Sequence, residues 1–414
     1  MKIAIICTEK RPIPAVQGGA VETLVDLLIR DNEMDHKASI DVYSIENNKA
    51  KRASRSLQHT QCIYMAPTDT WQTLRNFINR FCFKTHLPFY THTFLTQTIR
   101  KLKHRRYDWI VVENRPLFIP PLRKHLGSAA QIALHLHNDT LNQQCYYAAS
   151  VIRQCDCILS VSDFINHQVR GAAKNVHDHT KAHVLYNRIA PEFFRLKRNY
   201  AHDLLRKQCG VMSEKQIVLY FGRLRIDKGV LNLIQAFTQA LQKNNHLFLV
   251  LIGSFTNDDD QLHIMSALDR LPSGTFSHLN YIPHDQLPNY LSEADMIALP
   301  SICNEAFGLT IAEAMALGKT VITTDSGAIP ELIGSNAGII VKRNQRLNDQ
   351  LAKIILTCAA NPKLRMRIGR HARETALRRF QPEGYMEEMM MKLNRPDADP
   401  RSIRHENRKR HVDQ

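Results

Sequence analysis

The chain has 414 residues, of which 44% are apolar and 23% are charged, and its formal net charge is +16. This length and composition allow two domains with full hydrophobic cores. The sequence contains neither an uncharged apolar run of transmembrane length nor a signal-peptide cleavage site, so a membrane-spanning or exported chain is not expected. The nine cysteines include no C-x-x-C pair. They are expected to be reduced and to bind no metal.

The chain begins with a predicted strand at 2–7, a loop that contains Gly18 and Gly19, and a predicted helix from Val21 to Leu28. Paired glycines allow the backbone to approach a ligand closely, and the start of a helix attracts phosphate. Gly18 and Gly19 are therefore candidate phosphate-binding residues. The loop lacks the G-x-G-x-x-G pattern of dinucleotide-binding proteins, which argues against a nicotinamide cofactor.

Further apolar segments in the first half predict strands that alternate with helices. These segments are 40–44, 109–113, 131–136, 157–161 and 183–186. The alternation predicts a parallel sheet with helices on both faces, and ligands bind at the carboxyl ends of such strands. His137 lies at one of these ends. A metal site at His135 and His137 would need further ligands, which the sequence does not identify.

A basic and aromatic stretch from 74 to 106 accounts for part of the positive charge. It contains eight Lys or Arg residues and no acidic residue, and large apolar side chains interleave with the basic ones. Two interpretations stay open: a solvated helical face over a core, or a surface that binds an anionic membrane or a lipid-linked acceptor. No nucleic-acid-binding module is found, so nucleic acid is not an expected partner.

A segment of mixed charge at 191–213 is the predicted linker. A strand at 217–221 follows, and then the loop 222–229, in which Arg223 and Lys228 lie between glycines. Arg can bind two phosphate oxygens and Lys adds a compact positive charge, so this loop suits a diphosphate. A solvated charged turn is the alternative. The acidic run 258–260 is expected in a solvated polar turn and not in a metal site.

The most informative segment is 304–317, with the sequence N-E-A-F-G-L-T-I-A-E-A-M-A-L. It follows an apolar strand at 296–301, and its spacing predicts a helix that starts near Ala306. Glu305 then lies in the loop and Glu313 on the helix. They are too far apart to share a proton, so they suit two parts of one extended ligand. The amides expected to attract phosphate at this helix start are those of Phe307, Gly308 and Leu309.

The run E-A-F-G-L-T-I-A-E-A-M-A-L-G resembles the signature of retaining GT-B glycosyltransferases of the family 4 type, and G-R-L-R-I-D-K-G resembles their diphosphate-binding loop. The resemblance is dense from 217 to 333 and thin from 44 to 131. It implies an α/β protein with the GT-B fold, in which two Rossmann-like doubly wound domains face each other across a cleft. One departure is Ala328, where members of the family often have a second glycine.

The resemblance also implies a reaction, in which a sugar passes from a UDP- or GDP-linked donor to an acceptor hydroxyl with retention and without a metal. Arg223, Lys228 and the helix start would stabilise the leaving diphosphate. By the same resemblance, His137 and Glu305 would contact the reacting sugar, with His135 as the competing match for His137. Glu313 would contact the ribose, and the backbone of Ile282 would contact the nucleobase.

The predicted domains are an acceptor-binding domain at 1–190, a linker and hinge at 191–213, a donor-binding domain at 214–380, a helix at 381–394 that crosses back to the first domain, and a disordered tail at 395–414. The expected setting is polysaccharide or glycolipid assembly by a cytoplasmic enzyme at the inner face of the membrane, with a sugar or lipid-linked acceptor. Two alternatives stay open: a nucleotide-sugar epimerase of the same fold, and a non-catalytic surface or assembly protein.

Overall fold

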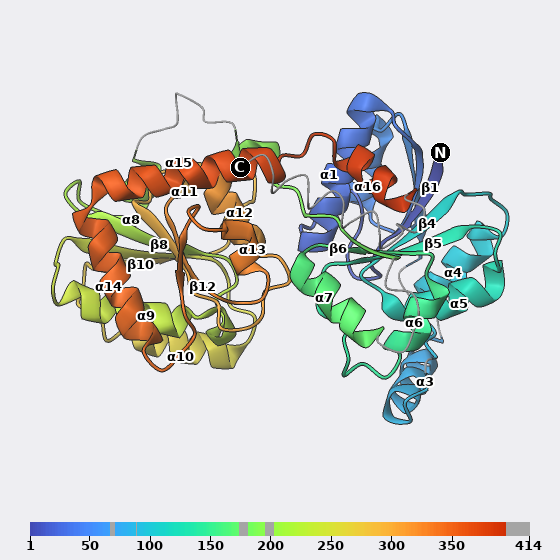
Figure 1. Ribbon diagram of the computed structural model, residues 1–414, viewed down its shortest axis with the longest axis horizontal. Helices are drawn as coiled ribbons and strands as arrows, with labels where there is room; N and C mark the ends of the chain where they lie inside the picture. The colour runs from blue at the N-terminus through green and yellow to red at the C-terminus, as the bar shows by residue number, and fades with distance from the viewer. Residues whose placement is uncertain (67–70, 88, 174–180, 195–202, 395–414) are drawn as a thin grey trace, which may run out of the picture. The chain divides into compact units, whose positions relative to one another are not determined.

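The computed structural model describes residues 1–66, 71–87, 89–173, 181–194 and 203–394 (Figure 1). The chain divides into two compact units, of which unit 1 comprises 1–186 and 382–414 and unit 2 comprises 187–381. Each unit is built on one parallel sheet, which confirms the fold class predicted from the alternation of strands and helices. The predicted disordered tail at 395–414 lies outside the described residues.

Unit 1 contains seven parallel strands in the order β3-β2-β1-β4-β5-β6-β7. The strands are β1 (Lys2–Ile6), β2 (Ser39–Ile45), β3 (Thr60–Met65), β4 (Trp109–Glu113), β5 (Gln131–Leu136), β6 (Cys157–Ser160) and β7 (Ala182–Val184). Sequence analysis missed β3. The order changes direction between β1 and β4, and sheets of this type bind ligands at the carboxyl ends of the strands beside such a switch point.

The helices of unit 1 connect these strands, and α16 returns from the end of the chain. They are α1 (Ala20–Asp35), α2 (Asn48–Ala53), α3 (Gln72–Lys84), α4 (Thr93–Leu102), α5 (Ile119–Leu126), α6 (Ala148–Gln154), α7 (Asp163–Ala172) and α16 (Tyr385–Leu393). α16 packs on α1 and buries Tyr385, Met386 and Met389 in the core of unit 1. Asp31 of α1 fixes the start of α16, because its carboxylate accepts hydrogen bonds from the Gly384 and Met386 amides at 2.9 and 2.8 Å.

Unit 2 contains six parallel strands in the order β10-β9-β8-β11-β12-β13, with the switch point between β8 and β11. The strands are β8 (Gln216–Phe221), β9 (Leu247–Ile252), β10 (Phe276–Leu279), β11 (Met296–Leu299), β12 (Val321–Thr324) and β13 (Ile339–Val341). The helices are α8 (Leu204–Cys209), α9 (Val230–Leu241), α10 (Asp258–Leu268), α11 (Leu287–Leu291), α12 (Leu309–Ala316), α13 (Ile329–Ile333), α14 (Leu347–Ala360) and α15 (Pro362–Arg379).

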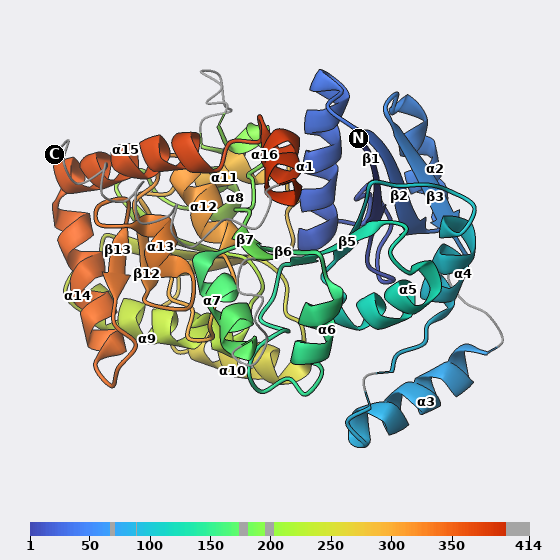
Figure 2. The same cartoon turned by 45° about the vertical axis from the view of Figure 1, so that its right-hand side comes forward.

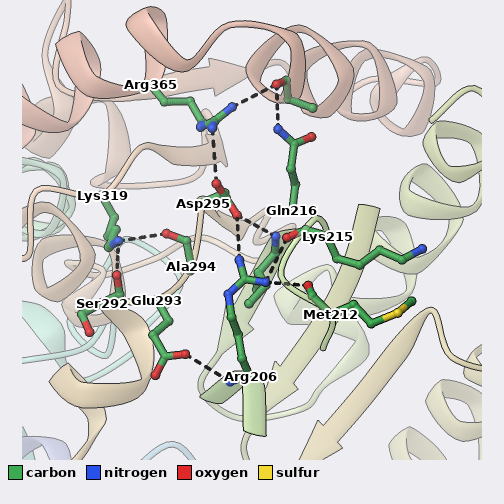
Figure 3. Close-up of polar contacts among 12 residues, drawn as sticks. Arg206, Met212, Lys215, Gln216, Ser292, Glu293, Ala294, Asp295, Lys319 and Arg365 are labelled. Atoms are coloured by element: carbon green, nitrogen blue, oxygen red, sulfur yellow. Dashed lines mark hydrogen bonds and ion pairs between the residues drawn. The ribbon is translucent and has the colours of Figure 1, made fainter. Parts of the chain in front are cut away.

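A polar network joins α8, α15 and the residues before β11 and β12 (Figure 3). Asp295 binds Arg365 at 3.3 Å and Arg206 at 3.8 Å, and the Arg206 guanidinium donates to the Met212 and Lys215 carbonyls. The predicted linker at 191–213 therefore includes a helix that is packed into unit 2, at the amino ends of the strands. In the described part of this segment, Arg206 thus connects α8 to the residues before β11. Residues 195–202 lie outside the described part.

The acidic run 258–260 also differs from its prediction. These residues form the first turn of α10, and the Asn257 side chain caps that helix by accepting from the Asp260 amide at 2.8 Å. Acidic residues are favourable at this position because the start of a helix carries partial positive charge. Figure 2 shows the same elements from a second side. In the part of the chain that the structure describes, every helix is too short or too polar to cross a lipid bilayer.

Candidate functional site

The centre of the candidate site in unit 2 is an ion pair between two loops. Lys228 ends the 3-10 turn Ile226–Lys228 after β8, and Glu305 lies in the loop after β11, the neighbouring strand. The Lys228 ammonium donates to Glu305 Oε1 at 2.7 Å. Burial opposes the charge on the lysine, but the charge and hydrogen bond of Glu305 raise the pKa of Lys228. The sequence prediction that both residues serve one site is thus consistent with their contact.

The helix start beside Glu305 is formed by Gly308. Helix α12 begins at Leu309, three residues later than expected, because Gly308 adopts a φ of 99° that α-helical geometry excludes. Phe307 is buried and packs edge-on against Phe380 with ring centroids 5.5 Å apart. The Ile311 amide donates to the Gly308 carbonyl, so the amides before Ile311 precede the first bond of the helix.

The backbone of Glu305 is fixed by the segment after β12. Gly327 has a φ of 52°, and a Cβ on it would lie 2.3 Å from the Glu305 carbonyl oxygen, so only glycine fits there. The Ala328 amide donates to the same carbonyl at 2.9 Å. The alanine at 328 is compatible with this contact, because the backbone amide makes it and the side chain is fully buried.

Arg223 lies at the end of β8 and is exposed. Its carbonyl accepts from the Tyr220 hydroxyl at 2.8 Å. Within the described residues, its guanidinium makes no hydrogen bond or ion pair. Arg225, to which the sequence gave no role, pairs with Asp227 at 2.5 Å. The Asp227 carbonyl accepts from the Ile302 and Cys303 amides, each at 3.0 Å, and so joins the loops after β8 and β11.

Glu313 of α12 has a partner that sequence analysis missed. His284 Nε2 lies 2.8 Å from Glu313 Oε1. Burial lowers the pKa of His284, but the hydrogen bond and charge of Glu313, with Glu192 and Asp285, outweigh it and raise that pKa. Ile282 precedes His284 by two residues and is largely buried. The only sequence signal for His284 was its position after the β10 segment.

The glycine loop of unit 1 holds a buried carboxylate. Gly19 precedes α1 with a φ of 111°, and Glu22 follows in the first turn of that helix. A Cβ on Gly19 would lie 2.2 Å from Glu22 Oε2, and Glu22 Oε1 accepts from the Thr8 hydroxyl at 2.6 Å. A carboxylate beside this helix start opposes a bound phosphate by charge. The assignment of Gly18 and Gly19 to the diphosphate stays a prediction, and Glu22 argues against it.

His137 lies just after β5 and is buried together with His135 and Glu113. His137 Nε2 is 2.8 Å and His135 Nδ1 is 3.1 Å from Glu113 Oε2. Burial raises the pKa of Glu113, but the two histidines outweigh it and lower that pKa to about 2. Burial, and then the charge of His135, lower the pKa of His137. The ligand atoms of the three residues lie within 4.8 Å of one another, a spacing that a metal ion could use.

Residues 202–375 match the family described as glycosyl transferases group 1. This region of the chain is thus similar to group 1 glycosyltransferases. It contains the Lys228–Glu305 pair, Arg223 and α12, so the candidate site of unit 2 lies entirely within the matched residues.

Similarity to curated proteins extends over both units. YtcC of Bacillus subtilis, whose own assignment as a glycosyltransferase is provisional, is 27% identical over 90% of this chain and 87% of its own length. Spore coat protein SA of the same organism is 25% identical over 92% of this chain and 96% of its own length. A third relative is CapM of Staphylococcus aureus, a capsular polysaccharide biosynthesis glycosyltransferase. It is 26% identical over 57% of this chain and 61% of its own length.

Among solved structures, Anabaena HepE in complex with UDP and glucose superposes with a TM-score of 0.73 at 20% identity, covering 96% of this chain and 100% of HepE. At this identity the similarity establishes the fold, which is GT-B. Together with the family match, it supports a GT-B glycosyltransferase.

Proposed function

We propose that the protein is a retaining glycosyltransferase that moves a sugar from a UDP- or GDP-linked donor to an acceptor hydroxyl in polysaccharide or glycolipid assembly. One observation carries this proposal: Lys228, Glu305 and the start of α12 come together at the switch point of the unit 2 sheet. The switch point is where ligands bind in such sheets. The similarity to CapM supports the setting in polysaccharide synthesis.

Negative charge builds on the leaving diphosphate as the glycosidic bond breaks, and the site offers groups that stabilise it. Lys228 is a half-buried cation already oriented by Glu305, and Arg223 adds an exposed guanidinium just after β8, the strand that Lys228 also follows. The amides at Gly308 and Leu309 lie at the positive end of α12. Removing one preorganised donor of this kind lowers turnover by about 10²–10³-fold. These groups make the proposed reaction metal-independent.

The sugar and the ribose would bind to the two glutamates. Glu305 Oε1 is held by Lys228, so its other oxygen is placed to accept from a sugar hydroxyl. Glu313 Oε1 is held in the same way by His284, and its other oxygen is placed to accept from a ribose hydroxyl. Ile282 would contribute backbone contacts to the nucleobase. In unit 1, His137 would contact the reacting sugar.

The product of transfer tests this proposal. The wild type, incubated with a nucleotide sugar and an alcohol acceptor, should give a glycoside with the anomeric configuration of the donor, measured by proton NMR. Glu305→Gln should lower turnover by at least about tenfold, since it weakens a charge-assisted contact to the sugar. An inverted product would contradict retention. A rearranged nucleotide sugar formed without acceptor would indicate an epimerase.

A second candidate function is a non-catalytic role, which the similarity to spore coat protein SA favours. Such a protein would need no defined site for a diphosphate. The paired Lys228 and Glu305 argue for catalysis, because a half-buried carboxylate and ammonium gain little stability from their pairing alone. Transfer or donor hydrolysis by the wild type, lost in Lys228→Ala, distinguishes the two functions.

We also propose that the basic and aromatic stretch of unit 1 contacts an anionic membrane surface. Helix α3 projects from the sheet of unit 1 (Figure 2), and Phe77, Phe81 and Phe83 on it are 70%, 57% and 66% exposed. Trp71 and Leu74 beside them are also exposed. Not every basic residue of the stretch is available to lipid, because Arg105 binds Asp41 at 2.7 Å. Exposed aromatic residues with basic neighbours favour anionic bilayers.

A further inference from the structure

Glu113 is a buried carboxylate to which sequence analysis gave no role. It ends β4, and the parallel register places it beside His135 of β5. Both histidines lie close to the same oxygen of Glu113, Oε2. The distance to it is 2.8 Å from His137 Nε2 and 3.1 Å from His135 Nδ1. The three side chains are at most 5% exposed. The Asn114 side chain also accepts from the His137 amide at 3.2 Å, so the backbone of His137 is held by the same strand end.

This geometry determines where the ring proton of His137 lies. An ionised carboxylate only accepts hydrogen bonds, so the ring nitrogen that faces it must carry a hydrogen. The lowered pKa of Glu113 keeps it ionised, and the lowered pKa of His137, caused by burial and then by His135, keeps that ring neutral near pH 7. A neutral ring has one proton, which lies on Nε2. His137 Nδ1 is then a hydrogen-bond acceptor.

We propose that Glu113 is a positioning residue that fixes the Nε2–H tautomer of His137, so that His137 Nδ1 accepts a hydrogen bond from a sugar hydroxyl. This inference rests on the proposed function. Within the described residues, the buried Nδ1 of His137 makes no hydrogen bond. Leaving such an atom unpaired costs about 1–3 kcal/mol. A hydroxyl donor recovers this cost, whereas a fully ionised phosphate has no proton to donate.

A metal ion held by the same three side chains is the competing interpretation. In metal sites, the second nitrogen of each histidine usually donates to a carboxylate, carbonyl or water, which orients the ring. Here His135 Nε2 and His137 Nδ1 both lack a partner among the described residues. The nitrogens that face Glu113 already lie at hydrogen-bond distance from it. The cluster therefore fits a hydrogen-bonded carboxylate better than a metal centre.

The test combines ring-nitrogen NMR with turnover. In the ¹⁵N-labelled wild type at neutral pH, His137, assigned by its loss in His137→Leu, should show a protonated Nε2 and a bare Nδ1. Glu113→Gln keeps an acceptor oxygen and should keep this tautomer, whereas Glu113→Leu should give a mixture. Turnover in Glu113→Leu should fall, though less far than in His137→Leu, and the double variant should lose no more than His137→Leu alone. Asp41→Asn, which alters another buried carboxylate of this sheet, should leave the His137 spectrum unchanged.

A wild-type spectrum with Nδ1 or both nitrogens protonated would overturn the proposal, and so would additive losses in the double variant. One equivalent of a transition metal, retained on purification and lost in His137→Leu, would also overturn it. The spectrum of the wild type needs no substrate, and His137→Gln can provide the assignment if the leucine variant does not fold. Absence of transfer by the wild type would count against the proposed function, while the spectrum would still decide the tautomer.

Discussion

At the scale of single residues, the sequence identified both members of the Lys228–Glu305 pair but only one member of two other polar pairs. Lys228, Glu305, Glu313 and His137 stand in informative local patterns, and the structure places each in a contact. The partner of Glu313 is His284, and the partner of His137 is Glu113. These partners come from other loops and strands, so their proximity depends on strand order and register, which local patterns do not encode.

The His284–Glu313 pair gives a prediction of pH-dependent stability. Since the pKa of His284 is raised in the folded state, the stabilisation is fully present below the unfolded pKa and is lost as the pH rises through the folded pKa. The difference in melting temperature between the wild type and His284→Gln should therefore be largest below about pH 6.5 and shrink as the pH rises above it. The effect should be at most about 1 kcal/mol, because the His284 side chain is 40% exposed.

The matched control is His371→Gln. His371 is exposed to the same degree, at 39%, and lies 3.5 Å from Glu374 on the surface of α15. At acid pH, the difference in melting temperature between the wild type and His371→Gln should be smaller than that between the wild type and His284→Gln. Equal pH profiles for the two variants would count against the pairing with Glu313.

At the scale of elements, apolar strands were predicted well and irregular segments poorly. The predicted ranges 109–113 and 131–136 coincide with β4 and β5, because a fully buried strand is a short apolar run. β3 was missed because its sequence T-Q-C-I-Y-M mixes polar and apolar residues, and three of its six residues are partly or fully exposed. The start of α12 was misplaced because Gly308 adopts a positive φ that the helical spacing of the apolar residues does not reveal.

The packing of α16 on unit 1 predicts a contrast within one helix. Met389 is fully buried in the core of unit 1, whereas Met391 is 56% exposed. Met389→Ala should destabilise unit 1 by about 2–5 kcal/mol, because it leaves a cavity, and Met391→Ala should change its stability by less than about 0.5 kcal/mol. The rate of hydrogen exchange of the α1 amides measures the stability of unit 1 in each variant. Equal exchange in the two variants would show that α16 contributes little to unit 1.

At the scale of the whole molecule, charge and exposed aromatic residues are unevenly distributed. The net charge is +16, and several of the most exposed aromatic side chains lie on α3 in a stretch without acidic residues. The GT-B fold and a candidate diphosphate site could be predicted from sequence, because residues 217–333 carry the local motifs. The acceptor could not, because an acceptor surface would combine side chains from separate elements of the chain.

The membrane proposal predicts binding to vesicles that contain an anionic phospholipid, and weaker binding to vesicles of phosphatidylcholine alone. The double variant Phe77→Ser and Phe81→Ser should bind at least about tenfold more weakly, since tenfold corresponds to about 1.4 kcal/mol and each phenylalanine would bury more than that. The control is Leu262→Ser with Met366→Ser, two side chains of unit 2 that are 64% and 65% exposed. An equal loss in the control would show that α3 is not the contact.

The central claim is that the site around Lys228 binds the diphosphate of a nucleotide sugar. It is tested most directly by the thermal stability of the purified protein with a panel of UDP- and GDP-linked sugars. A donor at 100 times its dissociation constant should add about 2.7 kcal/mol to the stability of the wild type. This gain should disappear in Arg223→Ala and Lys228→Ala but persist in Arg346→Ala, which removes an exposed charge of unit 2 outside the site. No gain with any donor, or a gain that survives in Lys228→Ala, would contradict the account.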